Sequence, residues 1–216
     1  MSQNLDLKAI EQRAFRSFHQ DGLMDIYIGA LTLALSLFFA IPESGEGEGV
    51  YMGFALLGVA IAFAIFQLGK KFITTPRLGQ VRFGPERQRR KVTMMWVMGG
   101  FVMVTFGIFA YSVYVWKVGL PVPSPLSPSL ERSLVALIAG LISGVSVIVK
   151  SYFMEFVRGY YIGFALGCGL FFTIMLNSAL PVIAAGGFIL VPGLVIFAIF
   201  LRQHPLPPQE ARHGSL

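Results

Sequence analysis

Six apolar stretches, separated by short polar segments, constrain the fold of this chain more than any other feature. A helix that crosses a bilayer needs about 20 mostly apolar residues. The stretches near or at that length span residues 23–41, 50–68, 93–115, 133–149, 160–176 and 181–201. Because 55% of the 216 residues are hydrophobic and only 13% are charged, the chain has too few polar side chains to cover a water-soluble domain. The sequence therefore predicts an all-α membrane protein, a six-transmembrane-helix bundle.

The fourth and fifth stretches are separated only by a narrow break that contains Lys150, Glu155 and Arg158. One continuous helix through this region would place three charges in hydrocarbon, which is energetically expensive. We therefore expect two helices here rather than one.

The Lys and Arg residues gather in alternate polar segments. Segment 42–49 has no basic residue, whereas segment 69–92 has eight. If the segments alternate across the membrane, all Lys and Arg residues except Lys117 and Arg132 lie on one side. Basic loops stay in the cytoplasm, so the pattern predicts a multi-pass protein of the cell inner membrane with both termini cytoplasmic.

The N-terminal residues 1–21 have an amphipathic pattern. Apolar side chains at helical spacing share one face, opposite charged ones; they are Leu7, Ile10, Ala14 and Phe18. This pattern favours an interfacial helix on the inner leaflet. A helix that docks onto a partner protein is the alternative.

A shift of 134 positions relates the first two apolar stretches to the last two. The related positions include Arg16 with Lys150, Ser17 with Ser151, Asp21 with Glu155, and Tyr27 with Tyr161. The related helices run in the same direction, so the sequence predicts a parallel internal repeat, a type of symmetry found in membrane folds.

This repeat predicts one membrane domain with six parts. An interfacial helix (1–21) precedes the first repeat unit (22–68) and a basic cytoplasmic loop (69–92). Two connecting helices (93–149) lead to the second repeat unit (150–201) and a cytoplasmic tail (202–216).

Three motifs resemble a pattern in a family of uncharacterised bacterial inner-membrane proteins. They are Asp21-Gly22-Leu23-x-Asp25-x-x-x-Gly29, Thr75-Pro76-Arg77-x-Gly79-x-Val81-x-Phe83 and His204-Pro205-Leu206-Pro207. The resemblance spans most of the chain and implies a bacterial inner membrane, but no activity.

Ionisable residues near the cytoplasmic ends of the predicted helices are candidates for a functional site, because charge inside a membrane usually marks function. We expect a charged cluster at the cytoplasmic mouth of the bundle, formed by Asp21, Asp25, Arg77, Glu155 and Arg158. The spacing of Glu155 and Arg158 lets them pair on one helical face. The alternative is that the acids stabilise helix N-termini and pair with nearby cations.

The basic loop is a candidate contact for anionic head groups, which attract each nearby Lys or Arg by about 1 kcal/mol. The residues concerned are Lys70, Lys71, Arg82, Arg87, Arg89, Arg90 and Lys91. The sequence has no phosphate-binding glycine loop and no nucleic-acid recognition module. None of the three histidines has partners at metal-ligand spacing, so we expect no metal, no cofactor and no nucleic-acid partner.

Small residues recur at four-residue spacing in the fourth and fifth stretches: Ala136, Gly140 and Gly144, then Gly163 and Gly167. Such residues let membrane helices approach closely, which predicts tight packing within the bundle or in a homodimer. In the last stretch, Pro192 removes one backbone donor and predicts a kink or a break.

Three functional classes fit these features. The first is a structural or accessory component that contacts lipid or a larger membrane complex, favoured by the lack of a catalytic set of residues. The second is a small transporter or channel, favoured by the repeat and by Pro192. The third is an enzyme that acts on lipid at the cytoplasmic face.

Overall fold

The computed structural model describes residues 21–41, 47–78, 85–118 and 127–205. Helices account for almost all of these residues, and no strand occurs within these four ranges. The chain divides into two compact units, one holding the described residues up to 78 together with 179–205, and the other holding 85–178 without 119–126. The prediction of an all-α fold is confirmed.

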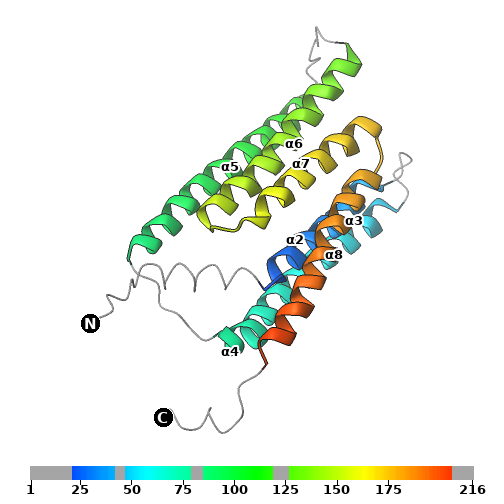
Figure 1. The fold of residues 1–216 in the computed structure, drawn as a ribbon. Helices are drawn as coiled ribbons and strands as arrows, with labels where there is room; N and C mark the ends of the chain where they lie inside the picture. The colour runs from blue at the N-terminus through cyan, green and yellow to red at the C-terminus, as the bar shows by residue number, and fades with distance from the viewer. Residues whose placement is uncertain (1–20, 42–46, 79–84, 119–126, 206–216) are drawn as a thin grey trace, which may run out of the picture. The chain divides into compact units, whose positions relative to one another are not determined.

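The first unit is built around helix α2 (Leu23–Ser36), which packs against α3 (Glu48–Leu68) and α8 (Leu180–Gln203), as Figure 1 shows. A short 3-10 turn, η1 (Leu37–Phe39), follows α2. Helix α3 continues through a π-helical turn, η2 (Gly69–Thr74), into α4 (Thr75–Leu78). The first four residues of α2, Leu23 to Ile26, are all buried, so the core of this unit lies around the start of α2.

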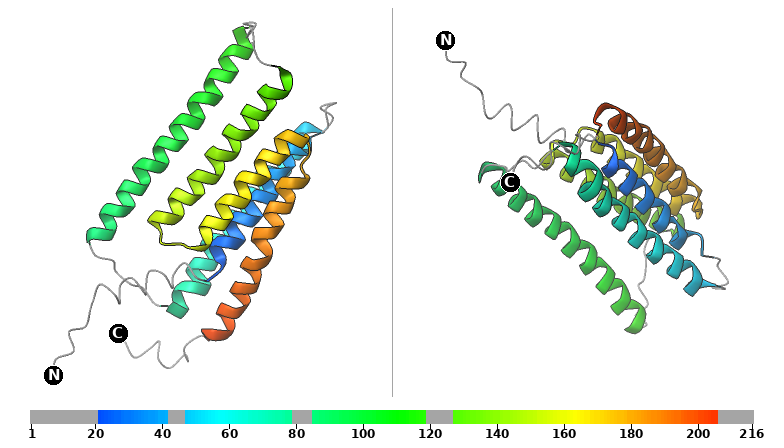
Figure 2. Two further views of the ribbon diagram at one scale, coloured as in Figure 1. Left: turned by 45° about the horizontal axis from the view of Figure 1, so that its top comes forward. Right: turned by 90° about the horizontal axis from the view of Figure 1, so that it is seen from below.

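The second unit contains α5 (Pro85–Val118), α6 (Pro128–Phe153) and α7 (Arg158–Leu176). Helices α6 and α7 form a closely packed antiparallel pair (Figure 2). A Cβ atom added to Gly144 would lie 2.8 Å from the carbonyl oxygen of Gly163, and one added to Gly140 would lie 2.7 Å from that of Gly167. The predicted close packing of these glycines is therefore confirmed, and it occurs within the chain.

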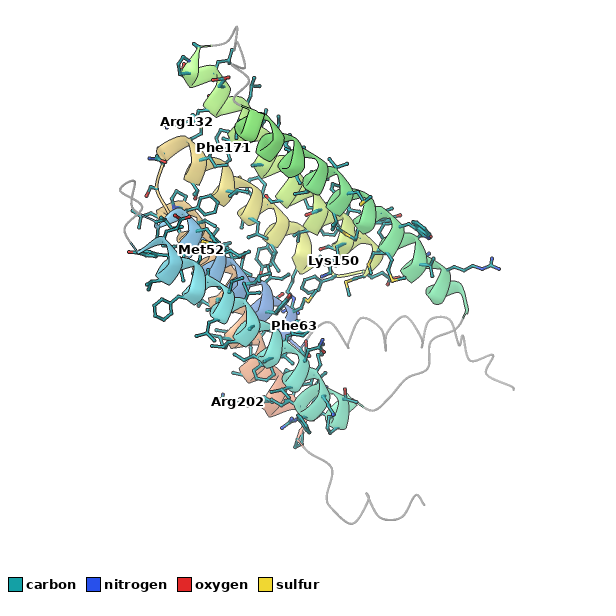
Figure 3. The ribbon with its side chains drawn as sticks, turned by 180° about the vertical axis from the view of Figure 1, so that it is seen from behind. Met52, Phe63, Arg132, Lys150, Phe171 and Arg202 are labelled. Carbon is teal, nitrogen blue, oxygen red and sulfur yellow. The ribbon has the colours of Figure 1, made fainter. Side chains whose placement is uncertain are left out.

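Four helical stretches are long and apolar enough to cross a membrane: Glu48–Arg77, Pro128–Phe153, Arg158–Leu176 and Leu180–Gln203. Two shorter apolar helices, Leu23–Phe39 and Val92–Thr105, overlap the remaining predicted spans. Large apolar side chains are exposed along α3, on which Figure 3 labels Met52 and Phe63. These features indicate a multi-pass membrane protein, while the count of six spans stays a prediction.

Most of the segment predicted as a basic loop, 69–92, is helical. Residues 69–78 extend α3 as η2 and α4, and residues 85–92 belong to α5. The prediction treated every basic residue as a loop marker, but long basic side chains are tolerated at the ends of membrane helices. Lys70 in particular has a buried partner, described below, that keeps this part of the helix within the protein.

Helix α8 runs through Pro192 without interruption, so the predicted break is absent from this helix. Membrane helices tolerate proline because neighbouring groups satisfy the backbone carbonyl that loses its donor. The predicted repeat relates α2 to α7 and α3 to α8. Because α7 and α8 belong to different units, the repeat stays a prediction, and the interfacial helix at 1–21 lies outside the described residues except for Asp21.

We expect Gly144→Ala to destabilise the α6–α7 pair, because the new methyl group would meet the backbone of Gly163. Overpacking of this kind costs about 1–3 kcal/mol. Gly99→Ala is the matched control, since a Cβ atom there meets nothing within 4 Å. Thermal unfolding in mild detergent should show a lower Tm for the first variant alone; equal values would contradict the packing described here.

Candidate functional site

Asp21 forms a buried charged contact with Lys70. Its side chain is 0% exposed, and its Oδ2 atom accepts hydrogen bonds from Lys70 Nζ at 2.8 Å and from Thr74 Oγ1 at 2.6 Å. Its Oδ1 atom accepts the backbone N–H of Leu23 at 3.2 Å. A carboxylate in apolar surroundings is tolerated only with such partners. The Asp21 site, defined as Asp21, Lys70 and Thr74, therefore ties the start of α2 to η2.

The glycine at position 22 lets the backbone turn so that Asp21 lies against η2. The backbone of Gly22 has φ +80°, a left-handed conformation that favours glycine. A Cβ atom at Gly22 would also lie 2.6 Å from the carbonyl oxygen of Gly193 in α8. The Asp21-Gly22-Leu23 segment thus turns into α2 while touching the backbone of α8.

The π-helical turn η2 supplies the other two members of the site. The backbone N–H of Thr75 donates to the carbonyl oxygen of Lys70, five residues earlier, and the hydroxyl of Thr75 donates to the same oxygen at 2.7 Å. Both Lys70 and Thr74 reach one carboxylate oxygen from this turn. Such π-helical turns are rare and recur at functional sites.

Asp25 lies one helical turn after Asp21 and is also 0% exposed. It is the acidic residue in the first turn of α2, where the helix dipole favours negative charge. A Cβ atom added to Gly193 would lie 2.8 Å from the Cβ atom of Asp25. Asp25 is therefore packed into the contact between α2 and α8.

Arg77 joins α4 to the end of α8. Its Nε atom donates to the carbonyl oxygen of His204 at 2.9 Å, and its Nη1 atom donates to that of Ile73 at 3.0 Å. The ring of His204 stacks on Phe200, with centroids 4.7 Å apart. A cation at a helix C-terminus is electrostatically favourable. The sequence predicted Arg77 in a cluster with acidic residues, whereas in the structure it binds the carbonyl of His204, the residue that follows α8.

Glu155 and Arg158 lie in the second unit. Glu155 occupies the turn between α6 and α7, with φ +52°, and forms a 3.5 Å ion pair with Arg90. Arg158 begins α7, and its guanidinium lies 5.3 Å from the ring centre of Phe156. The prediction that Glu155 and Arg158 share a helical face is wrong, because the left-handed backbone of Glu155 lies outside α7.

The five residues of the predicted charged cluster therefore fall in two units. Asp21, Asp25 and Arg77 belong to the first, and Glu155 and Arg158 to the second. The structure describes no arrangement of the five together, so that cluster stays a prediction.

The predicted anionic-lipid contact needs one correction. The side chain of Lys70 is only 12% exposed, because the buried carboxylate of Asp21 engages its ammonium group. Lys71, Arg89 and Arg90 are exposed, and Lys71 lies 5.3 Å from the ring centre of Phe72. Arg82 and the side chains of Arg87 and Lys91 lie outside the described part of the chain.

Within the described ranges, no group of three His, Cys, Asp or Glu residues is placed to hold a metal ion. Comparison with models of known protein families found no match, and comparisons with curated proteins and with solved structures found none either. The resemblance to a bacterial inner-membrane family therefore stays a prediction.

We expect Lys70→Met to destabilise the protein strongly, because it leaves the Asp21 carboxylate buried without its cation. Breaking a buried pair in this way costs about 3–5 kcal/mol. Lys71→Met is the control, since this neighbouring lysine is exposed and surface changes stay within about 0.5 kcal/mol.

The measurement is thermal unfolding of the purified variants in the same detergent. Adding Asp21→Asn to Lys70→Met should recover part of the lost stability, because it removes the buried charge. A Lys70→Met variant as stable as Lys71→Met would show that the pair is unimportant to the fold.

Proposed function

We propose that the protein is a six-span component of the bacterial inner membrane, with both termini cytoplasmic, that acts through contacts with lipid and with other membrane proteins. One observation carries this proposal: the buried Asp21 carboxylate accepts hydrogen bonds at both oxygens, from Leu23, Lys70 and Thr74 of the same chain. A group that binds a ligand or carries an ion needs bonding capacity left over for it. Asp21 instead uses these hydrogen bonds to hold the start of α2 against η2.

The outer face of α3 supports the same proposal. Only Ala55 and Ala62 are buried within this helix, whereas large apolar side chains are about half exposed or more, including Phe54, Leu57, Ile61 and Leu68. A face of this kind suits lipid chains or a neighbouring helix. The exposed Lys71, Arg89 and Arg90 suit anionic head groups.

A small transporter is the alternative, and Asp25 is the observation that favours it. An acid that is 0% exposed within an apolar helix is the usual mark of an ion or substrate pathway. Asp25 also faces Gly193, next to Pro192 in α8, and irregular helices often line such pathways.

The proposed orientation predicts opposite labelling of two single-cysteine variants made in a Cys168→Ala background. In spheroplasts, a membrane-impermeant maleimide should label Glu48→Cys from outside and should label Arg89→Cys only after lysis. Both positions are exposed in the structure. Labelling of Arg89→Cys in intact spheroplasts would reverse the topology.

The accessory role predicts position-dependent photo-crosslinking from α3. A photoreactive residue at Leu57 or Ile61 should give a discrete adduct with one membrane protein, while Ala55 and Ala62, which are buried, should give none. Adducts with lipid alone would leave no protein partner on this face. A solute flux in proteoliposomes that Asp25→Asn abolishes, with the fold intact, would favour the transporter instead.

A further inference from the structure

We propose that η2 is a conformational latch: the Asp21 site holds the helix in its π-helical form, and this form sets the rotation of α4 so that Arg77 reaches the end of α8. The inference rests on the site geometry and is independent of the proposed function. In this proposal, the hydrogen bonds of Asp21 at the start of α2 stabilise the last turn of α8 through η2 and Arg77.

The first step concerns helical register. A π-helical turn is in effect an α-helix with one extra residue, and an α-helix rotates by about 100° per residue. If η2 returned to the α-helical form, every residue after it would turn by about 100°. Arg77 would then lose the carbonyl oxygen of His204, which it now reaches at 2.9 Å.

The second step concerns what holds η2. Asp21 Oδ2 accepts from both Lys70 and Thr74, and charge-assisted hydrogen bonds of this kind are among the strongest in proteins. The Thr74 side chain is short, so its 2.6 Å contact with Asp21 depends on the rotation that η2 gives to residue 74. Thr75 completes the turn by donating twice to the carbonyl oxygen of Lys70. Without Asp21, only the Thr75 contacts hold the π-helical form, and the α-helical form is favoured because π-helical turns are rare.

The third step concerns what the latch controls. His204 follows the last residue of α8 and donates its backbone N–H to Phe200. Arg77 binds the carbonyl oxygen of this same residue, so it secures the last turn of α8. Any event that removes Lys70 or Asp21 from their contact therefore releases the end of α8 through η2.

Hydrogen exchange of the backbone amides of residues 201–204 tests the latch in the purified full-length protein. Asp21→Asn and Arg77→Gln should each speed their exchange by about tenfold, the effect expected when a charged hydrogen bond is lost from a local opening. The double variant should exchange no faster than either single variant, because both act through one contact. Lys71→Met is the control, and amides of α7 serve as the internal reference.

Deletion of Phe72 separates the latch from a general loss of stability. In the Asp21→Asn background, this deletion removes the extra residue while keeping the spacing from Ile73 to Arg77, so exchange at 201–204 should return to the wild-type rate. If Asp21→Asn does not fold, Thr74→Val serves as the milder variant, with the same expected rescue. The proposal would be overturned if exchange at 201–204 were unchanged in either single variant or if the two single effects added in the double variant. It would also be overturned if the deletion failed to restore protection.

Discussion

The buried carboxylate of Asp21 is the constraint on which the first unit depends. A negative charge in apolar surroundings must be met by donors from the chain, and here they come from two elements, the start of α2 and η2. Meeting that requirement positions the start of α2 beside η2. Because η2 leads directly into α4, it also positions Arg77, which binds the end of α8. The burial of one carboxylate thus fixes the contacts among α2, α4 and α8, which are far apart in the sequence.

The second unit achieves helix packing by a different means. Membrane helices gain no hydrophobic driving force by leaving lipid for one another, so close backbone approach has to supply the attraction. Gly140 and Gly144 meet Gly167 and Gly163 with no side chain between them. The α2–α8 contact of the first unit combines close backbone approach with buried charge. Gly22 and Gly193 bring the two backbones together, and the buried acids Asp21 and Asp25 lie next to this contact.

Hydropathy and small-residue spacing predicted much of this fold, because both are local properties of a helix. The apolar stretches coincide with helices, and the spacing of Gly140 and Gly144 predicted the face that packs. The Asp21–Lys70 pair escaped prediction because 49 residues separate its members, and no spacing rule relates them. For the same reason the sequence predicts Lys70 in a loop. A lysine after an apolar stretch usually marks the end of a helix, but a buried carboxylate such as Asp21 can pair with it and keep it within the helix.

Two buried acids four residues apart, Asp21 and Asp25, lie in different surroundings. Asp21 meets donors from its own chain at both oxygens, so its charge serves the fold. Asp25 is buried in the α2–α8 contact, where a Cβ atom added to Gly193 would lie 2.8 Å from its own Cβ atom. The absence of a side chain at Gly193 is therefore what makes room for the second acid. Close backbone approach at Gly193 and burial of Asp25 thus depend on the same missing side chain.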